Sequence, residues 1–162
     1  MLTLRPAQST AEMDTCARLM AESEPWITLG RDFAAARRTT GDPTKELTLA
    51  LDGGVIVGFV LINMHGAFVG YIQSVCVAPD RRGQGIGTAL LAYAEAHIFR
   101  DSPNVFMCVS TFNADAARLY QRLGYETIGE LRDYIVAGHG EILLRKTIGP
   151  LNGFRPAALE GR

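Results

Sequence analysis

The stretch PDRRGQGIGTALL, from Pro79 to Leu91, decides the fold. It follows an apolar run, AFVGYIQSVCVAP, which is typical of a β-strand and ends at Pro79. After its three glycines, apolar residues recur at the spacing of one helix face; these are Ile86, Leu90, Ala94 and Ile98. The stretch therefore predicts a strand, a glycine-rich turn and a helix, with the backbone open to close approach where the helix begins.

The turn and the first helical residues have the chemistry of an anion-binding site. The first turn of a helix presents unpaired N–H groups and the positive end of the helix dipole. We therefore expect a phosphate cradle formed by Arg82, Gly83, Gln84, Gly85, Ile86, Gly87 and Thr88. A P-loop would need a lysine after the glycines, and a dinucleotide site would need its third glycine where Thr88 stands. A glycine turn with only a structural role remains open.

Outward from this stretch, the hydrophobic pattern predicts the order β-α-α-β-β-β-α-β-α-β-β. Asp52-Gly53-Gly54 indicates a hairpin turn between two of the strands. NVFMCVS, residues 104–110, is nearly all apolar, which favours a strand buried on both faces. We expect the α/β (α+β) class, with one domain over residues 1–148 and a Gly- and Pro-containing C-terminal tail over residues 149–162.

Composition argues against several classes of function. The chain has 162 residues, of which 48% are hydrophobic and 20% charged, and its formal net charge of −1 gives no reason to expect nucleic acid or a membrane as partner. No apolar run reaches the ~20 residues of a membrane span, and the N-terminus lacks the apolar segment of a signal peptide. Cys16, Cys76 and Cys108 lie in apolar patterns without metal-ligand spacing. We therefore expect buried, reduced thiols, a cytoplasmic protein and no metal.

Two motifs resemble those of the GCN5-related N-acetyltransferase (GNAT) family. The family's cofactor motif, Q/R-x-x-G-x-G/A, is matched by Arg82, Gly85 and Gly87, and it follows a strand that ends V-x-P, as in the family. The segment NADAARLYQRLGYE, residues 113–126, is similar to the family's second landmark, N-x-x-A-x-x-L-Y-x-x-x-G-F/Y. The resemblance extends from about Leu2 to Lys146, because the predicted order of strands and helices agrees as well.

The resemblance implies a fold and a cofactor. The fold would be a mixed, mostly antiparallel sheet of about seven strands, with splayed central strands and about four flanking helices. The acetyl donor would be acetyl-coenzyme A (acetyl-CoA), with its pyrophosphate in the predicted cradle. Its pantetheine arm would pair with the backbone of Val75 and Val77, and Asn113 would contact the arm from the start of the next helix.

The implied reaction is direct attack of an amine on the thioester in a ternary complex. It needs a neutral amine, a polarised carbonyl and a stabilised thiolate, but no metal. The resemblance places Tyr120 beside the cofactor sulfur as the acid; the alternative is a core aromatic whose hydroxyl has another partner. The backbone N–H of Val75 or Val77 could polarise the carbonyl.

The general base is harder to assign. Strand alternation puts Val75, Gln73 and Tyr71 on one side, and the family often has Glu or His where Gln73 or Tyr71 stands. Neither is a base at neutral pH, although Gln73 could hold a water that relays the proton. A solvent base would suffice for an acceptor that is already partly neutral. The other candidates, elsewhere in the chain, are Glu22, Glu24, Asp133, His139 and Glu141.

The acceptor side is open to several interpretations. By the family's layout it would comprise the residues around Glu24 and Trp26, together with Tyr71, Asp133 and Tyr134. A small amine or a peptide N-terminus would fit, in a monomer or a homodimer. The alternative to an enzyme is a regulatory or sensor module that binds acetyl-CoA without turnover.

Overall fold

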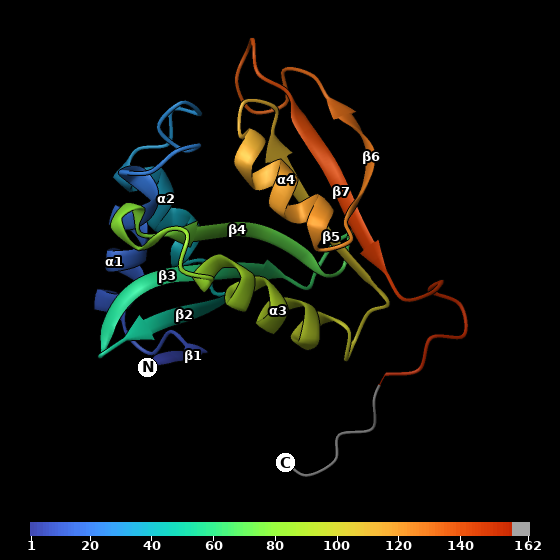
Figure 1. Cartoon of the computed structure of the whole chain (residues 1–162), viewed down its shortest axis with the longest axis horizontal. Helices are drawn as coiled ribbons and strands as arrows, with labels where there is room; N and C mark the ends of the chain where they lie inside the picture. The colour runs from blue at the N-terminus through green and yellow to red at the C-terminus, as the bar shows by residue number, and fades with distance from the viewer. Residues whose placement is uncertain (157–162) are drawn as a thin grey trace.

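Seven strands form one mixed sheet in the computed structural model, which describes residues 1–156. The strand order is β1-β2-β3-β4-β5-β7-β6, and every neighbouring pair is antiparallel except β4–β5 (Figure 1). This confirms the predicted mixed, mostly antiparallel sheet. The strands are β1 (Leu2–Pro6), β2 (Glu46–Asp52), β3 (Val55–Asn63), β4 (Tyr71–Val77), β5 (Asn104–Ser110), β6 (Glu126–Leu131) and β7 (Glu141–Thr147).

Four α-helices accompany the sheet in the described part of the chain: α1 (Thr10–Ala21), α2 (Phe33–Thr40), α3 (Ile86–Ile98) and α4 (Ala114–Arg122). None of these helices is long and apolar enough to cross a membrane. α1 begins where the Ser9 side chain accepts a hydrogen bond from the backbone N–H of Glu12, an N-cap. α2 begins at Phe33, after residues 24–30 have formed consecutive turns.

Each face of the sheet has its own core, as the alternation of strand side chains requires. On one face, α1 and α2 pack over Leu49, Phe59 and Leu61. On the other face α3 packs closely, because Gly58 has no side chain. A Cβ there would lie 2.7 Å from the Cys76 carbonyl and 3.3 Å from Leu90. The apolar stripe predicted for α3, Ile86, Leu90, Ala94 and Ile98, is buried in this second core.

Replacing Leu90 with Ala tests this second core. Leu90 has no exposed surface, so the change leaves a cavity, and we expect the free energy of unfolding to fall by about 2–5 kcal/mol. Urea denaturation measures the loss. The matched control is Leu151→Ala, at a side chain that is 70% exposed, which should change stability by no more than about 0.5 kcal/mol. A loss below about 1 kcal/mol at Leu90 would contradict close packing of α3.

The central strands separate after two residue pairs. β4 and β5 are paired only at Tyr71–Phe106 and Ile72–Met107, and Figure 1 shows β5 to β7 inclined away from β1 to β4. This confirms the predicted splay. It also leaves backbone groups of both strands facing the gap, where an extended molecule can pair with them.

β4 has a β-bulge that the sequence analysis did not predict. Leu61 of β3 pairs with Ser74, but Ile62 pairs with Ile72, so Gln73 is an additional residue in β4. Strict alternation predicted Tyr71 and Gln73 on the same side as Val75. That prediction was wrong for Tyr71, because the bulge reverses the phase and brings Ile72 into the same core as Val75.

Two other features differ from the predictions, the end of β6 and the burial of β5. The last-but-one strand ends at Leu131 rather than near Val136, because residues 132–140 form a loop in which Asp133 adopts a φ of 53°. β5 is not buried on both faces, since Phe106 and Cys108 are only half-buried. The predicted tail has no helix or strand over residues 149–156, and its last six residues lie outside the described part.

Candidate active site

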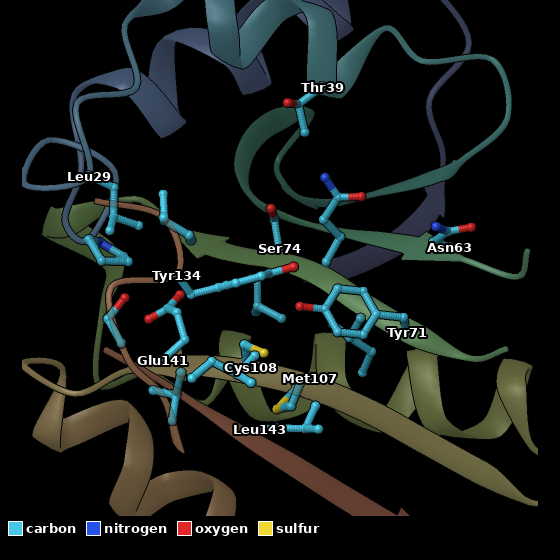
Figure 2. Close-up of a pocket in the computed structure, with 18 of the residues that line it drawn as sticks. Leu29, Thr39, Asn63, Tyr71, Ser74, Met107, Cys108, Tyr134, Glu141 and Leu143 are labelled. Atoms are coloured by element: carbon cyan, nitrogen blue, oxygen red, sulfur yellow. The ribbon is translucent and has the colours of Figure 1, made fainter. Parts of the chain in front are cut away.

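A cleft of about 880 Å³ opens where β4 and β5 separate. Its walls come from β4, β5 and the start of β7, from the turns around Trp26, from residues 63–68, from α4 and from the loop that carries Tyr134. Figure 2 shows the hydroxyls of Tyr71 and Tyr134 pointing into the same space, with Glu141 and Cys108 beside it. The cleft therefore brings together side chains from segments that lie far apart in the chain.

The glycine stretch forms an open cradle at the start of α3. Gly83 and Gly85 have φ values of 72° and 81°, in the left-handed region that favours glycine, and a Cβ at either would meet nothing within 4 Å. Gly85 caps the helix without a side-chain hydrogen bond, which leaves the first-turn N–H groups available. Ile86 contributes only its backbone, because its side chain is buried in the core. This geometry fits the pyrophosphate of acetyl-CoA.

The path from the cradle to the cleft follows the end of β4. The Arg82 Nε donates a hydrogen bond to the Val77 carbonyl at 3.3 Å, which holds the guanidinium beside the strand end. Val75 and Asn113 line the cleft itself. The Asn113 side chain caps α4 by accepting a hydrogen bond from the Ala116 N–H at 3.4 Å. An extended arm between these residues would run along the gap between the central strands.

Tyr120 lies on the cleft side of α4. Its ring packs edge-on against Tyr125, with 6.1 Å between the ring centroids, and it lines the cleft. Burial raises the pKa of Tyr120 to about 12, so the hydroxyl is protonated at neutral pH. It is thus available as a hydrogen-bond donor.

Glu141 is the one carboxylate among the residues that line the cleft. It begins β7 directly opposite Ser110 of β5, and only 5% of the residue is exposed. Neither its Oε2 nor the Ser110 Oγ has a hydrogen-bond partner within residues 1–156. Burial raises the pKa of Glu141, and the nearby Ser110 hydroxyl and Arg31 guanidinium oppose part of that rise. A buried carboxylate without a partner is costly to folding, which points to a function for it.

The chain can now be compared with known proteins. The sequence pattern of the Acetyltransferase (GNAT) family matches residues 9–125. The chain belongs to the GNAT acetyltransferase family. It is 31% identical over 152 residues to the N-alpha-acetyltransferase RimI of Mycobacterium tuberculosis, which covers 91% of this chain and 90% of that protein. It is 35% identical over 91 residues to an aminoalkylphosphonate N-acetyltransferase of Salmonella typhimurium, covering 52% and 59%.

Solved structures share the GNAT fold at lower identity. An aminoglycoside 6'-N-acetyltransferase complexed with coenzyme A has a TM-score of 0.73 at 18% identity, over 93% of this chain and 98% of that one. Salmonella typhimurium yncA, with its cofactor acetyl-CoA, has a TM-score of 0.75 at 16% identity, over 98% and 99%. The family membership makes this protein an N-acetyltransferase with acetyl-CoA as its acetyl donor, as the two motifs predicted.

The candidate bases of the GNAT protein differ in whether they line the cleft. Of the five carboxylate and histidine candidates only Glu141 does, together with Gln73, the residue expected to hold a relay water. The His139 ring instead packs edge-on against Phe112 at 5.0 Å. The Asp133 carboxylate accepts the Gly138 N–H at 2.7 Å, which fixes the loop.

The residues predicted for the acceptor side also differ in whether they line the cleft. Trp26, Tyr71 and Tyr134 line the cleft, as the sequence predicted, whereas Glu24 and Asp133 do not. The Glu24 carboxylate accepts hydrogen bonds from the Thr28 N–H and Oγ1, at 3.1 and 2.9 Å, and so stabilises the turns next to Trp26.

Among the cleft residues that sequence reasoning missed are Cys108 and Arg31. Cys108 was expected to be a buried thiol but is half-buried beside the Tyr71 hydroxyl, and burial raises its pKa. Cys16 and Cys76 are buried as predicted, and burial raises the pKa of each to about 12. The apolar strand pattern around Cys108 carries no signal for a cleft, and Arg31 lies in a turn without a motif.

Proposed function

We propose that the enzyme transfers the acetyl group directly to a primary amine in a ternary complex, with Glu141 as the general base and Tyr120 as the hydrogen-bond donor to the leaving sulfur. One observation carries this proposal. Glu141 is a buried carboxylate, with one oxygen lacking a partner among residues 1–156, in the same cleft as Tyr120. A pair of titratable groups with raised pKa values in one cleft is typical of an acid–base site.

The need for a base follows from the acceptor's own chemistry. An alkylamine with a pKa of ~10.4 is protonated at neutral pH, and freeing its lone pair costs about 4–5 kcal/mol. Glu141 can accept a hydrogen bond from the ammonium and take one proton before the attack, which frees the lone pair that forms the new N–C bond. Its raised pKa makes it a stronger base than a solvent-exposed carboxylate.

Tyr120 acts on the other side of the reacting carbon. A thiol has a pKa of about 8.5, whereas the pKa of Tyr120 is about 12. The hydroxyl therefore donates a hydrogen bond to the departing thiolate without complete proton transfer, and the thiolate takes its proton from solvent. The C–S bond breaks after the N–C bond has formed. Of the two protons that the ammonium loses, Glu141 takes the first and solvent takes the second as the amide forms.

Acetyl-CoA supplies the thioester for this step. The chain contributes the N–H groups of the Gly83–Gly87 cradle for the pyrophosphate, and the backbone of Val75 for the arm and the carbonyl oxygen. Asn113 is placed to contact the arm. These contacts hold the thioester in the cleft at a fixed distance from Tyr120.

The acceptor lies in the part of the cleft that is lined by Trp26, Tyr71, Tyr134 and Glu141, the acceptor half. Trp26, Tyr71 and Tyr134 provide aromatic surface, which attracts an ammonium group through cation–π interactions. Two relatives are named for N-alpha amino groups and for aminoalkylphosphonates. Both a peptide N-terminus and a small amine are thus acceptors of the right type.

Release of free thiol from acetyl-CoA, followed against a panel of amines, tests the proposed function. We expect thiol release to depend on the amine and an N-acetylated product to form. Binding of coenzyme A without thiol release for any amine would favour the sensor module instead. The control is Gly85→Val, because a β-branched residue at a φ of 81° is strained. This variant should lose coenzyme A binding in calorimetry.

A further inference from the structure

Arg31 is a second charged residue in the acceptor half of the cleft. It lines the cleft and is half-buried, yet within residues 1–156 its guanidinium makes no hydrogen bond and no ion pair. In contrast, Arg5, Arg37 and Arg145 each pair with a carboxylate. A half-buried guanidinium normally has a partner, because burial removes part of its hydration.

The backbone holds Arg31 at this wall. Its N–H donates a hydrogen bond to the Trp26 carbonyl at 2.9 Å, which closes the turns that precede α2. Trp26 itself is nearly buried, packed in the core beneath α1. The backbone of Arg31 is thus held by a hydrogen bond to a residue that is itself packed in the core.

Arg31 and Glu141 lie on the same cleft without forming an ion pair with each other. The guanidinium is close enough for its charge to lower the pKa of Glu141 in part, but no contact of 4 Å or less joins the two side chains. The space between them therefore has one negative and one positive side. A zwitterionic molecule matches this charge pattern, and a polycation does not, because Arg31 would repel its second ammonium group.

We propose that the acceptor is a small amine that also carries a carboxylate or phosphonate group, which Arg31 binds while the amine faces Glu141. This rests on the proposed function, since it assigns the acceptor of the same site. The planar guanidinium offers two parallel N–H donors, a geometry that suits both kinds of anion. Binding of such an acceptor gives both the Arg31 guanidinium and the Glu141 carboxylate a hydrogen-bond partner.

Matched pairs of acceptors test this inference. We would use 4-aminobutyrate with 4-aminobutyramide, and 2-aminoethylphosphonate with its diethyl ester, together with peptides that begin Ala-Asp or Ala-Asn. We expect kcat/KM to be about 10- to 100-fold higher for the anionic small amine of each pair. Comparing the carboxylate pair with the phosphonate pair shows which of the two anions the enzyme prefers.

The variant Arg31→Gln should lower kcat/KM for the anionic amines by about 10- to 100-fold and change it much less for the neutral amines, where only the effect of the Arg31 charge on Glu141 is lost. Arg31→Lys should restore part of the difference, because lysine keeps the charge but lacks the bidentate geometry. The matched control is Arg38→Gln, an exposed arginine of α2 that does not line the cleft. It should behave as the wild type. Affinity for coenzyme A should stay the same in all three.

Three results would overturn the inference. The first is equal activity of the wild type on both members of each pair. The second is an equal loss on both members in Arg31→Gln, which would mean that Arg31 only supports the wall. The third is a preference for the Ala-Asp peptide over every small amine. Calorimetry of the anionic amines with the enzyme–coenzyme A complex tests binding separately from the reaction. If the amines bind in an Arg31-dependent way but no thiol is released, the proposed function is contradicted and the inference about Arg31 is not.

Discussion

In the Glu141→Gln variant we expect kcat/KM to fall by about 10²- to 10⁴-fold, the contribution of a positioned general base. The amide has nearly the same shape as the carboxylate but cannot accept the amine's proton. The effect should appear in thiol release from acetyl-CoA at saturating cofactor. Affinity for coenzyme A should not change, because Glu141 lies in the acceptor half of the cleft, away from the glycine cradle.

Glu141→Gln should also lose the low-pH limb of the profile of activity against pH. Glu141 must be ionised to act as a base, so wild-type activity should fall as the pH falls through its raised pKa. Above that pH, activity still rises as the acceptor amine loses its own proton. The residual activity of Glu141→Gln should lack the lower limb and keep the rise that belongs to the amine.

Stability measurements distinguish lost chemistry from lost folding. A carboxyl whose folded-state pKa is raised binds protons more tightly in the folded protein, so its contribution to stability decreases as the pH rises between the unfolded and the folded pKa. Glu141→Gln removes this cost, and the variant should be at least as stable as the wild type at neutral pH. The matched control is Glu130→Gln, at an exposed carboxylate of β6 that does not line the cleft. Full activity of Glu141→Gln would exclude Glu141 as the base.

The cofactor half of the site could be predicted because its signals are local. A glycine at a left-handed φ, a helix that begins directly after it and a strand that ends before it are all consequences of neighbouring residues. The Arg82–Gly87 motif lies within one strand–helix connection, and the Asn113–Tyr125 motif consists of one helix and its two ends. Their chemistry depends on the backbone, so the spacing of a few residues was enough to predict the cradle.

The acceptor half depends on contacts between distant segments. Glu141 and His139 are two residues apart, and as candidate bases they could not be ranked from the sequence. They differ because Glu141 pairs with Ser110 at the start of β7, whereas His139 is still in the preceding loop and packs on Phe112. Where a strand begins is among the least predictable features of a sequence, and here it decides which side chain enters the cleft.

The bulge in β4 shows the same limit. Alternation is a rule for regular strands, and one additional residue at Gln73 reverses the side on which Tyr71 lies. No residue type in YIQSVCV requires a bulge. Arg31 was missed for a related reason, since it enters the cleft only because the turns after α1 fold back against the sheet.

The Tyr120→Phe variant should lower kcat by about 10²- to 10³-fold, the loss measured when one donor to a developing negative charge is removed. The phenyl ring keeps its edge-on contact with Tyr125 and its place on α4, so KM for acetyl-CoA should change little. Stopped-flow or steady-state thiol release measures kcat, and calorimetry with coenzyme A measures the affinity. The split between the two quantities identifies a role in the chemical step.

Tyr125 provides the matched control, because its hydroxyl has a structural partner. It donates a hydrogen bond to the Glu95 carboxylate at 3.0 Å, and Glu95 also pairs with Lys146. Tyr125→Phe should therefore lower stability by about 1 kcal/mol and leave kcat near the wild-type value. If Tyr120→Phe instead loses stability and retains kcat, its hydroxyl serves packing, as in the alternative of a core aromatic. Retained kcat with a weakened affinity for coenzyme A would assign the hydroxyl to the arm of the cofactor, away from the sulfur.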